Sequence, residues 1–176
     1  MVINDIKNTL DTIFLQFKKL GLDLSVNQNE LLLLKSKALS SIDPKTKKNY
    51  ASDFETPLLH YVFEPHEDSR SDKSVLLLGG IHPDEIAPLY TTWKLLIQYL
   101  KLEDSSTIKN RIIIVPLLNP DCFIGSGQQG FIPSRIKENG VDLNRDFYNP
   151  LEESLNSPGF QPEPEIDFLL HLIEPY

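Results

Sequence analysis

Two short apolar runs with a helical stripe between them constrain the fold of this chain more than any other feature. Residues 75–78 are continuously apolar and end in Gly79-Gly80, which is typical of a buried parallel strand. Residues 85–102 carry apolar side chains at helical spacing, and residues 111–118 form a second, isoleucine-rich run. Because strand, helix and strand in this order form a right-handed crossover unit, we predict an α/β fold.

Other segments extend this pattern. Residues 3–20 and 162–173 place apolar side chains on one helical face, and residues 58–63 suit a strand. The apolar run 31–34 has no clear period. Residues 119–140 are glycine-rich and long for a loop, which is typical of functional loops.

Composition excludes several classes of protein. The 176 residues suffice for one domain with a sizeable core. A formal net charge of −8 argues against a nucleic-acid surface. The single cysteine, Cys122, excludes an intrachain disulfide. The N-terminus lacks the basic start of a signal peptide, and no apolar run approaches the roughly 20 residues of a membrane helix. We expect a soluble, cytoplasmic protein without nucleic-acid or membrane partners.

The segment after the first buried run suggests a metal site. His82 and Glu85 follow Gly79-Gly80, in the place beyond a strand's carboxyl end where open α/β sheets bind ligands. Imidazole nitrogen and carboxylate oxygen are both good zinc ligands. The pattern is weak alone, since His82 could cap the strand and Glu85 could favourably start a helix.

A second cluster makes the pattern more specific. Asn119-Pro120-Asp121 opens the long loop, Arg135 lies within it, and Gly140-Val141-Asp142-Leu143-Asn144-Arg145 follows. In this order the motifs resemble the zinc carboxypeptidases that include pancreatic carboxypeptidase A, and among them the bacterial murein-peptide amidases. The resemblance runs from about Ser74 to the C-terminus. It implies a three-layer α/β/α sandwich with a mixed, largely parallel sheet.

The resemblance also implies residue roles. His82 and Glu85 correspond to the first two ligands of one zinc ion. Asp142 is similar to the carboxylate that hydrogen-bonds the ligand histidine and fixes its tautomer. Arg135 is similar to the arginine that polarises the scissile carbonyl and holds the oxyanion. Asn144 and Arg145 resemble the pair that grips the substrate's terminal carboxylate, and a guanidinium is chemically suited to that role.

The chain departs from the family pattern at its end. The second zinc-binding histidine and the general-base glutamate of the family follow the helix expected at 162–173, and the chain stops at Tyr176. The other histidines, His60, His66 and His171, look structural or solvated. We expect a truncated catalytic domain at 56–176, preceded by a helical extension at 1–55. We also expect this chain alone to lack full peptidase activity.

Three functions follow from this interpretation. The first is a zinc metallocarboxypeptidase that cleaves an amide bond next to a free carboxylate, in a peptide or a murein peptide. The nearest alternative is an N-acyl-amino-acid deacylase, similar to the aspartoacylase and succinylglutamate desuccinylase group. The last is a non-catalytic relative that binds carboxylates.

Overall fold

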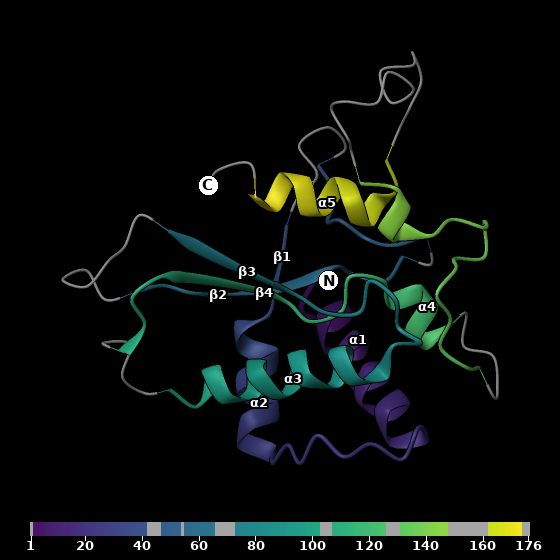
Figure 1. Ribbon diagram of the computed structural model, residues 1–176. Coiled ribbons are helices and arrows are strands. Elements are labelled where there is room, and N and C mark those ends of the chain that lie inside the picture. The colour runs from purple at the N-terminus through teal and green to yellow at the C-terminus, as the bar shows by residue number, and fades with distance from the viewer. Residues whose placement is uncertain are drawn as a thin grey trace.

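The structure is a computed structural model with helices on both sides of a small sheet (Figure 1). It describes residues 2–41, 47–53, 55–65, 73–102, 107–125, 131–147 and 162–173. The elements in chain order are α1 (Val2–Lys19), α2 (Gln28–Lys37), β1 (Leu39–Ser40), β2 (Leu59–Phe63), β3 (Ser74–Leu78), α3 (Ile86–Leu100), β4 (Arg111–Val115), α4 (Pro120–Ile124), the 3-10 helix η3 (Leu143–Arg145) and α5 (Pro164–Ile173).

The sheet has the order β1-β2-β4-β3 and is mixed, as predicted. Strands β3 and β4 are parallel neighbours, with Leu76 opposite Ile113 and Leu78 opposite Val115. They are joined by α3, so the predicted crossover unit is confirmed. Strand β2 runs antiparallel to β4, and β1 antiparallel to β2. Of the three strand pairings in the described residues, that of β3 with β4 is parallel and the other two are antiparallel, so the sheet is mixed there but not largely parallel.

The side-chain alternation of β4 explains the three layers. Ile112 and Ile114 are buried in the cluster that α1, α2 and α3 cover, whereas Ile113 and Val115 are buried in the cluster under α5. Successive side chains of a strand point to opposite faces, so an apolar run of this kind requires helices on both. Figure 1 shows α5 on one face and α1 to α3 on the other, which confirms the α/β/α sandwich.

The N-terminal helices pack into this core. Helix α1 confirms the stripe at 3–20 and buries Leu10 and Phe17, and the Phe17 ring lies edge-on to Trp93 of α3 with centroids 6.1 Å apart. Helix α2 was not predicted. It starts at a capping box of Asn27 and Glu30, and its apolar run has no helical period because Leu34 is its one fully buried side chain.

The long loop after β4 contains a helix that the sequence did not reveal. Helix α4 begins directly after Asn119, whose side-chain oxygen accepts a hydrogen bond from the Cys122 N–H. Five residues are too few to show a helical period. Helix α5 confirms the stripe at 162–173. No helix in the described part of the chain has the length and apolar character needed to cross a membrane.

Candidate functional site

Two glycines bring the end of β3 against the end of β4. The backbone pairing continues past both strands, since Leu118 N–H donates to Gly79 O and Asn119 N–H donates to Gly80 O. A Cβ at Gly79 would lie 2.6 Å from the Pro116 carbonyl oxygen. Gly80 adopts a φ of +63°, which side chains disfavour. The glycines therefore allow the close turn that delivers His82 to the carboxyl edge of the sheet.

Asp142 contacts His82, in the position that the family resemblance implied for it. Nε2 of His82 lies 2.8 Å from Oδ1 of Asp142, and the His82 side chain is only 10% exposed. The same oxygen accepts the backbone N–H of Asn144 at 2.9 Å. The hydrogen bond from His82 holds the pKa of Asp142 below its ordinary value. An ionised Asp142 can only accept a hydrogen bond, so Nε2 of His82 carries the proton and donates it, and Nδ1 keeps the lone pair that a metal requires.

Nδ1 of His82 faces Glu85. The distance from Nδ1 to Oε1 of Glu85 is 3.4 Å, which is long for a hydrogen bond. Ligands about 2.1 Å from a tetrahedral zinc ion lie about 3.4 Å from each other, so the two atoms fit two corners of such a site. Among the described residues, no group of three His, Cys, Asp or Glu side chains could hold a metal ion. In this part of the chain, zinc thus finds two fitting donors, Nδ1 of His82 and Oε1 of Glu85.

Arg135 lies beside this pair. Its Nη2 donates to Oε1 of Glu85 in a short contact, and its Nε is 3.8 Å from Oδ2 of Asp84. The side chain is 43% exposed, so it borders the open side of the site. A guanidinium in this position places positive charge next to the atoms that face His82.

Asn144 and Arg145 belong to η3, directly after Asp142. Asn144 lines a cavity of about 210 Å³ together with His82, Glu85 and the Gly80 turn. Arg145 is exposed, and its Nη1 donates to the carbonyl of Asn144 at 3.3 Å. The structure therefore brings Asn144 into the cavity of the candidate ligands and leaves Arg145 outside its lining.

Larger cavities lie elsewhere. One of about 610 Å³ is bordered by α1 and the segment that follows it. Another, of about 360 Å³, borders Lys137 and Cys122. Neither contains an imidazole paired with a carboxylate, so chemistry rather than volume identifies the candidate site.

The remaining histidines behave as expected where the structure describes them. His60 is buried in β2, with its ring 5.9 Å from that of Phe168. His171 lies in α5, with its ring 5.7 Å from that of Tyr50. His66 lies outside the described residues.

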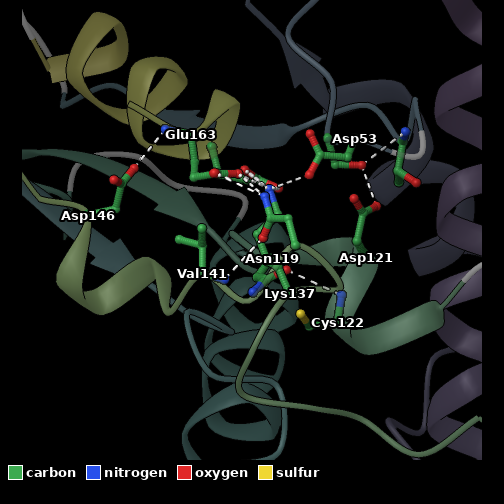
Figure 2. A network of polar contacts seen from close by, with 12 residues as sticks. Asp53, Asn119, Asp121, Cys122, Lys137, Val141, Asp146 and Glu163 are labelled. Carbon is green, nitrogen blue, oxygen red and sulfur yellow. Dashed lines mark hydrogen bonds and ion pairs between the residues drawn. The ribbon is translucent and has the colours of Figure 1, made fainter. Parts of the chain in front are cut away.

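A buried polar network next to the site was missed by sequence reasoning. Lys137 is 4% exposed, and its ammonium contacts the carboxylates of Asp53, Glu163 and Glu165 (Figure 2). Burial opposes the charge on Lys137, but its three carboxylate partners hold the pKa of this ammonium above the ordinary value. No sequence signal joins these residues, because they meet only through the packing of distant segments.

Comparisons with known proteins place the chain in a family. The model of the Succinylglutamate desuccinylase/Aspartoacylase catalytic domain matches residues 71–162, more than half of the chain. The matched residues contain His82, Glu85, Arg135, Asp142, Asn144 and Arg145. No functionally curated protein matches the chain.

Two solved structures resemble it in fold. A metallo-carboxypeptidase from Burkholderia cenocepacia has a TM-score of 0.50 at 17% identity, covering 84% of this chain and 38% of its own. A candidate carboxypeptidase from Burkholderia mallei has a TM-score of 0.48 at 18% identity, covering 77% of this chain and 32% of its own. The chain thus spans 32% and 38% of the length of these proteins, and identity this low speaks for the fold alone.

The family match includes every residue that the motifs singled out, and the observed fold is the one those motifs implied. By this match the protein belongs to the Succinylglutamate desuccinylase/Aspartoacylase catalytic domain family, which confirms the zinc carboxypeptidase-like resemblance.

Proposed function

We propose that this protein is a zinc-dependent hydrolase that cleaves an amide bond next to a free carboxylate. The observation that carries the proposal is the position of His82, whose Nε2 contacts Asp142 while its Nδ1 lies 3.4 Å from Oε1 of Glu85. His82 and Glu85 would each supply one bond to one zinc ion. Bound there, zinc would supply Lewis acidity and a water of lowered pKa.

Arg135 would stabilise the oxyanion. Its guanidinium already lies against Glu85, next to the proposed metal pair, and is 43% exposed toward solvent. Negative charge that develops on a scissile carbonyl oxygen in this region would meet donors that are already in place. This position supports the role that the sequence resemblance implies.

Asn144 and Arg145 would bind the substrate carboxylate. Asn144 lines the cavity that holds His82 and Glu85, so its amide can donate to a group bound there. Arg145 is exposed beside it and can turn its guanidinium toward an incoming carboxylate, to which it can offer two parallel hydrogen bonds. Together they would place the amide bond over the metal pair.

Two substrate classes meet this description. A peptide with a free C-terminus and an N-acyl amino acid both offer an amide next to a carboxylate. The sequence motifs resemble those of peptidases, whereas the matching family is named for succinylglutamate desuccinylase and aspartoacylase. We therefore give the N-acyl amino acid equal standing with the peptide as a substrate class. The match at 71–162 also fits our proposal that the catalytic part occupies residues 56–176.

The test measures the hydrolysis of matched substrates by the zinc-loaded protein, as isolated from its source. The substrates are an N-acyl amino acid, a dipeptide and the carboxamide analogue of each. The proposal expects hydrolysis of at least one free acid, its loss on chelation, and much weaker use of the carboxamides. Charge-assisted hydrogen bonds contribute about 1.5–3 kcal/mol, so Arg145→Ala should reduce kcat/KM by roughly 10- to 100-fold.

The outcomes separate the alternatives. Preference for the N-acyl amino acid identifies a deacylase, and preference for the dipeptide identifies a carboxypeptidase. Binding of the free acids without turnover identifies a non-catalytic relative. Equal rates of hydrolysis of the free acids and the carboxamides would show that Asn144 and Arg145 do not bind the substrate carboxylate.

A further inference from the structure

The ammonium of Lys137 joins three segments that are far apart in the sequence. Its Nζ lies 2.9 Å from Oδ2 of Asp53, 2.6 Å from Oε2 of Glu163 and 2.9 Å from Oε2 of Glu165 (Figure 2). Asp53 precedes β2, Glu163 precedes α5, and Glu165 lies in the first turn of α5. The Lys137 side chain is 2% exposed, and that of Glu165 is fully buried.

Such a network holds its geometry tightly. A buried charge is costly unless it is paired and hydrogen-bonded, so the ammonium cannot leave its carboxylates without a large penalty. Glu163 and Asp53 are partly exposed, which lets water share their charge. The side chains of Lys137 and Glu165 are buried away from water, so each charge depends on the other as its partner.

Two more contacts fix the segment that contains Lys137 to the start of α5. The side-chain amide of Asn139 donates to Oε1 of Glu163 at 3.1 Å. The backbone N–H of Glu163 donates to Oδ2 of Asp146 at 2.7 Å. A turn closes the segment between them, since Lys137 N–H donates to the Val141 carbonyl at 3.0 Å. Residues 137–146 are therefore anchored on Glu163 near both ends.

The anchored segment carries the residues of the candidate site. Asp142, Asn144 and Arg145 lie between the two anchors, and Arg135 lies two residues before the first. Asp142 reaches His82 across 60 positions of sequence, and their contact depends on where this segment lies relative to β3.

We infer that Lys137 and Glu163 are positioning residues, which hold segment 137–146 so that Asp142 orients His82 and Asn144 lines the cavity. Their value to catalysis rests on the proposed function, but their effect on His82 does not. The competing interpretation is a network that only stabilises the fold. That interpretation predicts a lower melting temperature and an unchanged site in the protein that remains folded.

The experiment uses variants that keep a folded chain. Lys137→Met with Glu165→Met replaces the buried pair by apolar side chains of similar length, which buried ion pairs tolerate when both partners change. Glu163→Ala removes a partly exposed anchor and leaves its backbone N–H. Lys137→Arg tests rescue, because the adjacent cavity of about 360 Å³ gives room for a guanidinium. Lys35→Met is the matched control, since it removes a lysine, 16% exposed, from its 2.6 Å contact with Asp11.

Three readouts are taken on each variant. These are the melting temperature, the imidazole nitrogen and proton resonances of His82, and the affinity for N-acetylglycine by titration. Positioning predicts that the double variant and Glu163→Ala move the His82 resonances toward those of Asp142→Asn. Their affinity for N-acetylglycine should fall by about tenfold, the lower end of the loss in metal affinity or activity that is typical when the partner of a metal-binding histidine is lost. Lys137→Arg and Lys35→Met should keep the wild-type resonances.

The inference is overturned if the double variant and Glu163→Ala are folded and show wild-type His82 resonances. The proposed function fails separately, if the wild-type protein binds neither N-acetylglycine nor a dipeptide with a free C-terminus. The resonances still decide the positioning role in that case, because they do not depend on a ligand.

Discussion

Nε2 of His82 lies 2.8 Å from Oδ1 of Asp142, although 60 positions separate the two residues. This contact fixes the orientation of the imidazole ring, so that Nε2–H donates to Asp142 while Nδ1 faces Glu85. It also links the turn after β3 to the segment that carries Asn144 and Arg145. The chemistry proposed for the site depends on it.

Asp142→Asn tests the orientation of His82. The amide keeps the size of the carboxylate but removes its charge, so it no longer selects one tautomer. Loss of a group that orients a ligand typically lowers metal affinity by about 10- to 100-fold, and we expect zinc affinity to fall in that range. The affinity is measured by competition with a chromophoric chelator. Asp84→Asn is the control, because Asp84 lies near Arg135 rather than His82; equal effects of the two variants would contradict the assignment.

Gly80→Ala tests the turn that delivers His82. At Gly80 φ is +63°, and an added Cβ would lie 2.6 Å from Cδ1 of Leu117. Gly21 has a similar φ of +73° with no atom within 4 Å, so Gly21→Ala isolates the backbone strain. We expect Gly21→Ala to cost about 1–2 kcal/mol of unfolding free energy, and Gly80→Ala about 1–3 kcal/mol more. Urea unfolding measures both, and equal losses would show that the contact with Leu117 is relieved without cost.

Burial of His60 predicts a loss of stability on acidification. Burial lowers the pKa of His60 from an ordinary 6.5 to about 4. Because the folded-state pKa is the lower one, this contribution to stability is complete above about pH 6.5. It declines as the pH falls toward 4, where the loss reaches on the order of 3 kcal/mol.

The measurement is urea unfolding at several values between pH 7 and pH 4. His60→Gln removes the titrating ring and should flatten this part of the profile relative to the wild type. His171→Gln is the control, since it removes an imidazole from α5 and leaves His60 in place. A wild-type profile as flat as that of His60→Gln would contradict the prediction.

The parts of the fold that the sequence predicted are those with a strong apolar pattern. Helix α3 carries apolar residues at helical spacing, β3 and β4 are continuous apolar runs, and the order of the three elements requires them to be neighbours. Helix α4 has only five residues, and α2 buries little beyond Leu34, so neither shows a period. Their starts depend on the single side chains of Asn27 and Asn119.

The residues of the candidate site were likewise predictable only in part. His82 and Glu85 are close in sequence, so their convergence could be expected from one turn. Asp142 could be placed only through the family resemblance. The Lys137 network could not be foreseen, because the acidic residues around α5 look like ordinary helix-start carboxylates until packing brings them to a buried lysine.

The most direct test of the central claim is the zinc content of the purified protein. It is measured by elemental mass spectrometry for the wild type, His82→Ala and His171→Ala, after identical dialysis against trace zinc. We predict zinc in the wild type and in His171→Ala, and its loss in His82→Ala, because Nδ1 of His82 supplies one of the two donors. Equal zinc in the wild type and in His82→Ala would contradict the assignment of the metal site.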